Sequence, residues 1–117
     1  GASLGAGAAL VAAARLADRI QAVVTRGGRP DLASEHLPDV RSPTLLIVGG
    51  RDHEVLELNQ QALNMLNCPK RLIIVSGATH LFEEPGTLMH VANHAKDWFV
   101  NCFRRLRSGD RKKTRSR

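Results

Sequence analysis

The sequence predicts an α/β fold of three layers, in which a parallel sheet of about three strands is flanked by helices. The first observation is a set of short apolar runs, typical of buried strands, at 20–25, 44–48 and 71–75. The second is a set of helix-forming segments that alternate with these runs, at 6–18, 55–66 and 87–105. Strands that alternate with helices usually pair in parallel, because each connecting helix returns the chain to the same end of the sheet.

The first third of the chain predicts a helix, a strand and a loop. Residues 6–18 consist mostly of alanine and other strong helix formers, and they follow Gly5 directly. The apolar run 20–25 predicts a short buried strand, which the glycines and proline of 26–31 end. Residues 32–40 predict a helical or irregular connection, and Pro38 and Pro43 mark it as loop.

The middle of the chain carries the strongest strand pattern. Residues 44–48 are a continuous apolar run between Pro43 and the pair Gly49 and Gly50, which is typical of a parallel strand buried on both faces. An amphipathic helix is expected over 55–66, with Leu56, Leu63 and Leu66 among its apolar positions.

The last third predicts a strand at 71–75, a loop at 78–86 and a final helix at 87–105. That helix has apolar residues at helical spacing, namely Val91, Ala95, Trp98, Phe99 and Cys102.

The positive charge is concentrated at one end of the chain. The formal net charge is +6, and residues 104–117 hold eight Lys/Arg and one Asp, a net of +7. Residues 1–103 are therefore close to neutral and form the expected single domain. The end of the chain has little to bury, so 104–117 are expected to be a basic disordered tail.

The remaining composition indicates a cytoplasmic protein. Two cysteines, Cys68 and Cys102, are too few for a disulfide framework, and neither lies in a C-x-x-C motif. No apolar run is long enough to span a membrane, and the alanine-rich start lacks the charged region of a signal peptide.

The first five residues, Gly1-Ala2-Ser3-Leu4-Gly5, spell G-x-S-x-G, the pattern of a nucleophile elbow. A serine hydroxyl needs an imidazole to take its proton, and the imidazole needs a carboxylate to orient it. Asp52 and His80 follow predicted strands, whose carboxyl ends meet at one edge of a parallel sheet. The chain order of Ser3, Asp52 and His80 is the order found in α/β-hydrolases.

The chain resembles the C-terminal half of an α/β-hydrolase of the dienelactone-hydrolase-like group, close to serine hydrolase domains joined to phosphoribosyltransferases. The residues that carry the resemblance are GASLGAGAAL at 1–10, VVTRGGRPDL at 23–32, PTLLIVGGRD at 43–52 and GATHLFEEPG at 77–86. The chain is thus expected to be a fragment, a partial hydrolase domain over 1–103.

The resemblance implies a role for each residue of the proposed site. Ser3 would be the nucleophile, Asp52 the triad acid, His80 the base and the Leu4 amide an oxyanion donor, with Gly1 and Gly5 as the elbow glycines. The implied substrate is a small ester or related acyl compound, with no metal or organic cofactor. Dienelactone hydrolases proper use a cysteine nucleophile, so their substrate is not transferred to this serine.

The chain also departs from an intact α/β-hydrolase. About five strands that lead into the elbow are not in the sequence, nor is the loop that gives the second oxyanion donor. Loss of one such donor costs roughly a hundred- to a thousandfold in rate, so the chain alone is expected to be nearly inactive. The uncovered edge of the 20–25 strand is expected to favour self-association or pairing with an N-terminal half.

Each assignment has an alternative. The alternative for Ser3 is a small residue in a glycine-rich turn or a phosphate-binding loop. The alternative for Asp52 is a helix N-cap, and the alternative for His80 is an ordinary loop histidine. Glu83 and Glu84, near His80, are expected to form a charge pattern at a helix start that is favourable to the helix dipole, and the alternative is that one of them is catalytic.

Two further function classes come from other parts of the sequence. His90 and His94 have metal-ligand spacing, but Val91 stands where H-E-x-x-H has glutamate, so no metal is expected. The basic tail could contact nucleic acid or other polyanions on a non-catalytic scaffold derived from a hydrolase. Without stacking aromatics or a recognition helix, nucleic-acid binding is not the expected function.

Overall fold

The computed structural model of the chain describes residues 4–16 and 19–115, and describes side chains over 5–16 and 19–104. Its helices and strands are α1 (Leu4–Arg15), β1 (Val23–Arg26), β2 (Thr44–Gly49), α2 (His53–Met65), β3 (Lys70–Val75) and α3 (Thr87–Arg115). Two short 3-10 helices, η1 (Pro30–Ala33) and η2 (Leu37–Asp39), lie in the connection between β1 and β2.

The three strands form one parallel sheet in the order β1-β2-β3. Val23 of β1 lies opposite Thr44 of β2, which in turn lies opposite Lys70 of β3. β2 is the central strand, and all six of its residues are buried. This agrees with its continuous apolar run and confirms the predicted fold class.

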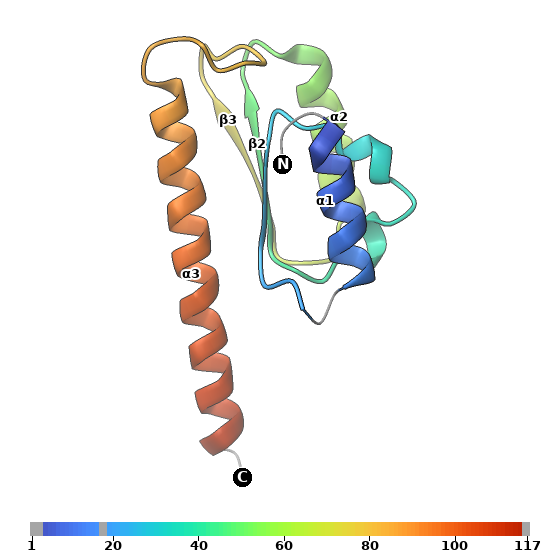
Figure 1. Cartoon of the computed structure of the whole chain (residues 1–117), viewed down its shortest axis with the longest axis vertical. Helices are drawn as coiled ribbons and strands as arrows, with labels where there is room; N and C mark the ends of the chain where they lie inside the picture. Colours follow the sequence, from blue (N-terminus) through green and yellow to red (C-terminus); the bar gives the residue numbers. More distant parts are fainter. Residues whose placement is uncertain (1–3, 17–18, 116–117) are drawn as a thin grey trace.

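Helices cover both faces of the sheet (Figure 1). On one face, Leu46 of β2 packs in a core with Leu10 of α1 and Leu66 at the end of α2. On the other face, the alternate residues Leu45 and Ile47 share a core with residues that include Phe82 and Val91. Successive side chains of a strand point to opposite faces, so one apolar strand supplies both cores.

The bounds of α1 and β1 differ from the 6–18 and 20–25 that the sequence predicted. β1 begins at Val23, although the apolar run begins at Ile20. Ladder pairing starts where the Val23 amide donates to the carbonyl of Pro43, 2.9 Å away. The Ile20 carbonyl instead accepts a hydrogen bond from the Ser42 hydroxyl. α1 ends at Arg15, before the expected end at residue 18.

The last helix is longer than predicted. α3 continues to Arg115, so residues 104–115 are helical where a disordered tail was expected. Arg and Lys are good helix formers, and positive charge is favourable near the C-terminal end of a helix dipole. A segment with few apolar residues to bury can therefore still continue a helix, and the prediction of a disordered tail did not take this into account.

Candidate functional site

Two loops that follow adjacent strands form the candidate site. β2 ends at Gly49, and Asp52 lies just beyond it at the N-cap position of α2. β3 ends at Val75, and the following loop carries His80 before α3 begins at Thr87. Because β2 and β3 are parallel neighbours, both loops emerge at the same end of the sheet, at the top of Figure 1.

The structure brings Asp52 and His80 into direct contact. Nδ1 of His80 lies 2.7 Å from Oδ2 of Asp52. The Asp52 side chain is 14% exposed and the His80 side chain 39% exposed. An ionised carboxylate can only accept, so Nδ1 donates and Nε2 becomes the acceptor nitrogen of the neutral ring. This is the tautomer that a general base requires.

The N-cap position of Asp52 does not use its side chain. The Asp52 carbonyl accepts the first helical bond, from the Leu56 amide at 2.8 Å, but the carboxylate makes no capping hydrogen bond. A role as a helix cap therefore explains the position of the Asp52 backbone. It does not explain the contact between the Asp52 carboxylate and His80.

The loop of His80 is held by hydrogen bonds on both sides of the histidine. Glu84 accepts from the Thr79 amide at 2.9 Å and from the Thr79 hydroxyl at 2.7 Å. Farther along, the Thr87 hydroxyl lies 2.8 Å from the carbonyls of both Phe82 and Glu84. The Thr79 amide and then the Thr79 hydroxyl hold the pKa of Glu84 below its ordinary value.

Phe82 anchors this loop in the core. Its side chain is 1% exposed, and its backbone has a φ of 55°, which is uncommon for a bulky residue. The guanidinium carbon of Arg26, at the end of β1, lies 5.8 Å from the centre of the Phe82 ring, within the range of a cation–π interaction.

Two glycines allow close approach at the site. Gly27, which follows β1, has a φ of 56°, and a Cβ there would lie 3.4 Å from Nδ1 of His80. A Cβ at Gly49 would lie 2.8 Å from the carbonyl carbon of Ala78, which is too close. Sequence reasoning missed Gly27 and the role of Glu84, since the patterns around them are those of a turn and a helix start.

The structure describes only part of the predicted nucleophile elbow. Ser3 and Gly1 lie outside the described residues, and Leu4 opens α1. A Cβ at Gly5 would meet no described atom within 4 Å, so no steric need for this glycine is visible. The next residue, Ala6, is fully buried and packs tightly against Gly28.

The other candidates from the sequence lie apart from this contact. His90 and His94 on α3 border a hollow of about 210 Å³ together with Ser76. Within residues 4–16 and 19–115, no three His, Cys, Asp or Glu residues gather in a way that could hold a metal ion. No helix in this described part is both long and apolar enough to span a membrane.

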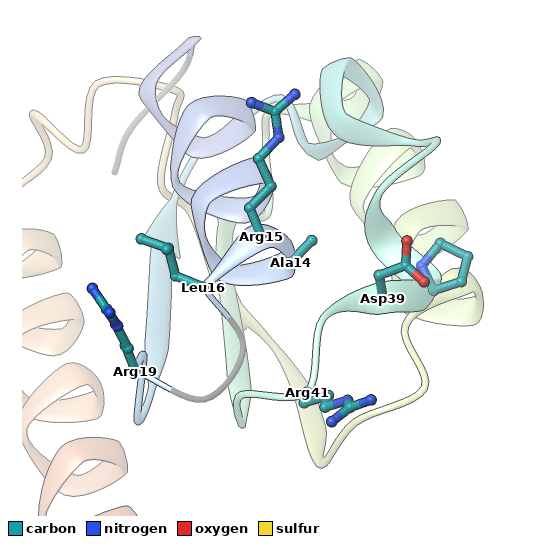
Figure 2. Close-up of a pocket in the computed structure, with 7 residues that line it drawn as sticks. Ala14, Arg15, Leu16, Arg19, Asp39 and Arg41 are labelled. Carbon is teal, nitrogen blue, oxygen red and sulfur yellow. The ribbon is translucent and has the colours of Figure 1, made fainter.

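A larger hollow, of about 700 Å³, lies elsewhere and is not the candidate site (Figure 2). It is bordered by the end of α1 and by the η2 region, with Arg15, Arg19, Asp39 and Arg41 around it. The arginines point in different directions, and neither Asp52 nor His80 borders the hollow.

The known proteins to which the chain is similar are longer than the chain itself. No protein-family model matches it. It is 62% identical over 101 residues to a Mycobacterium tuberculosis protein named "putative phosphoribosyl transferase", in strains H37Rv and CDC 1551. The match covers 86% of this chain but 23% of the relative, so the chain spans less than a quarter of those proteins.

Two solved structures are similar. A dienelactone hydrolase from Anabaena variabilis matches with a TM-score of 0.85 and 58% identity, over 86% of this chain and 47% of that one. A "predicted CIB-like hydrolase" from Thermoplasma acidophilum matches with a TM-score of 0.64 and 24% identity, over 79% of this chain and 47% of that one. The second likeness concerns the fold alone. The chain has a hydrolase-like α/β fold and spans about half the length of each hydrolase.

Proposed function

We propose that the chain is part of a serine hydrolase of the α/β-hydrolase type that acts on an ester or a related acyl compound. Ser3 is the nucleophile, His80 the general base and Asp52 the residue that orients His80. The observation that carries the proposal is the 2.7 Å contact between Nδ1 of His80 and Oδ2 of Asp52 at the carboxyl edge of the sheet.

In this mechanism, Nε2 of His80 takes the proton of the Ser3 hydroxyl as Oγ bonds to the substrate carbonyl carbon. The tetrahedral intermediate then breaks its bond to the leaving oxygen, which receives the same proton from His80. Water then releases the acyl group from Ser3 by the same steps. His80 takes a proton from the water as the water oxygen bonds to the acyl carbon. The bond from that carbon to Oγ of Ser3 then breaks, and Oγ receives the proton from His80. Asp52 stabilises the imidazolium in both halves.

Packing around α1 supports a place for Ser3 near His80. Ala6 packs against Gly28, and the neighbouring Gly27 packs against His80, so this glycine pair links the first turn of α1 to the histidine. Ser3 directly precedes α1 in the sequence. The amide of Leu4 opens the helix, and the first amides of a helix lack partners within it, which suits an oxyanion donor.

The comparisons support hydrolysis as the reaction, and they are compatible with a second activity in another part of the longer relatives. The 58% identity to a dienelactone hydrolase favours hydrolase chemistry. The phosphoribosyl transferase name belongs to proteins of which this chain covers 23%. We infer that the chain corresponds to a hydrolase-like part of such proteins.

Turnover of p-nitrophenyl acetate tests the proposal, in this chain and in a longer protein that contains it. Ser3→Ala and His80→Asn should abolish turnover, since each removes a reacting group. Ser76→Ala is the matched control, because Ser76 is an exposed serine just after β3. Turnover that persists in Ser3→Ala, or that is absent from both proteins, would contradict the proposal.

A further inference from the structure

The carboxylate of Glu84 is bonded to the residue that immediately precedes His80. One oxygen accepts from the Thr79 amide at 2.9 Å, and the other accepts from the Thr79 hydroxyl at 2.7 Å. Both oxygens of the carboxylate are thus used on a single residue. Hydrogen bonds to an ionised acceptor are stronger than neutral ones, so this contact fixes the backbone at Thr79.

The other side of His80 is fixed by the core. The Phe82 amide donates to the Thr79 carbonyl at 3.1 Å, and the buried Phe82 ring cannot move without opening the α3 face of the sheet. His80 therefore lies in a short loop whose two ends, Thr79 and Phe82, are both held. Glu84 closes residues 79–84 into a ring.

The orientation of Glu84 differs from that of a residue serving the helix start. α3 begins at Thr87, and the Glu84 carboxylate turns back along the chain to Thr79. The adjacent Glu83 is exposed. Two neighbouring glutamates therefore have different environments, and only Glu84 contacts the residue beside the histidine.

We propose that Glu84 is a positioning residue for His80, which acts through Thr79 to hold the imidazole in reach of Asp52. The catalytic part of this inference rests on the proposed hydrolase function. The positional part does not, because the contact between His80 and Asp52 exists in the chain whether or not it turns over a substrate.

The first experiment measures the His80 tautomer in the full chain by nitrogen-15 NMR, at a pH where the ring is neutral. His80→Asn assigns the signals. The wild type should hold the Nδ1–H tautomer that the Asp52 contact requires. Glu84→Ala should lower the ratio of Nδ1–H to Nε2–H by about tenfold, the effect of losing a typical hydrogen bond. Glu84→Gln should give an intermediate ratio, because an amide can still accept from Thr79.

Glu83→Ala is the matched control, since it removes the same charge one residue away. Thr79→Val keeps the amide bond and removes the hydroxyl bond, so it should give a smaller change than Glu84→Ala. Urea unfolding of each variant shows whether it is folded. A folded Glu84→Ala or Thr79→Val chain whose ratio equals that of Glu83→Ala would overturn the inference.

A second readout separates this inference from the proposed function. The rate at which a fluorophosphonate labels Ser3 should fall about tenfold in Glu84→Ala and remain unchanged in Glu83→Ala. The labelling rates are compared in a longer protein that contains the chain. Absence of labelling in that wild-type protein would count against the hydrolase, while the tautomer ratio in the chain would still decide the positional role. Equal labelling rates in wild type and Glu84→Ala would overturn the catalytic part.

Discussion

Gly49 at the end of β2 lies directly against Ala78 in the loop that carries His80. The Ala78 carbonyl accepts a hydrogen bond from the Arg51 amide at 2.9 Å, and a Cβ at Gly49 would collide with that carbonyl. The loops of Asp52 and His80 are therefore joined through their backbones as well as through the two side chains. This backbone contact lies beside the Asp52–His80 pair and holds the two loops together.

Gly49→Ala should separate the two loops. Overpacking in a buried region typically lowers the free energy of unfolding by about 1–3 kcal/mol, so the variant should unfold at a lower urea concentration than the wild type. The NMR contact between Asp52 and His80 should weaken as well. Ser76→Ala is the control, because Ser76 is exposed and lies just after β3, where a substitution usually changes stability by less than about 0.5 kcal/mol. An unchanged midpoint for Gly49→Ala would show that the loop can move aside.

Phe82→Ala should be strongly destabilising. The buried ring fills the core between the His80 loop and the α3 face, and loss of such a ring typically costs about 3–5 kcal/mol. Phe103→Ala provides the comparison, because Phe103 is 52% exposed and exposed substitutions usually change stability by less than about 0.5 kcal/mol. Equal urea midpoints for the two variants would refute the anchoring role of Phe82.

Asn59→Ala should loosen the loop after β1. The Asn59 side chain is fully buried in α2, and its Nδ2 donates to the Gly28 carbonyl at 3.1 Å. Removal of the donor leaves a buried carbonyl unsatisfied, at a cost of about 1–3 kcal/mol. Asn64→Ala, at an exposed position of α2, should cost much less. Thermal unfolding of both variants measures the difference, and similar melting temperatures would contradict this role.

Acid should weaken the wild type more than Glu84→Gln. The folded pKa of Glu84 lies below its ordinary value of 4.5, chiefly because the Thr79 amide donates to it. For a depressed carboxylate, the stabilisation is complete above the unfolded pKa and is lost as the pH falls through the folded pKa. The free energy of unfolding, measured by urea from pH 7 to pH 2.5, should fall more steeply for the wild type below about pH 4.5. Glu83→Gln should follow the wild type, and parallel curves for all three proteins would disprove the linkage.

The sequence predicted the sheet well, because its physical basis is local. The run 44–48 between Pro43 and Gly49 has few alternatives to a buried parallel strand, and the structure places it at the centre. The end of α3 was harder to predict, since the helix propensity of Arg and Lys competes with the tendency of charged segments to remain unfolded. The sequence also did not show where β1 begins, because pairing depends on Pro43, far along the chain.

The candidate site was predictable where a residue type and its place after a strand coincide. Asp52 and His80 follow adjacent strands, so parallel topology predicted that they would meet. Glu84 was not predicted to contact Thr79, because the turn at Phe82 has a positive φ that its residue type does not indicate. Ser3 lies outside the described residues and stays a prediction.

Covalent labelling by a fluorophosphonate, read by intact mass and by peptide mapping, tests most directly whether Ser3 is a nucleophile. Labelling at Ser3 is expected in a longer protein that contains this chain. No label is expected in Ser3→Ala, and a rate about 10⁴-fold lower is expected in Asp52→Asn, because that variant loses the correct tautomer of His80. The same experiment on the 117-residue chain measures how much of the reactivity it retains. A folded longer protein that is not labelled, or that is labelled equally in Ser3→Ala, would contradict the role of Ser3 as the nucleophile.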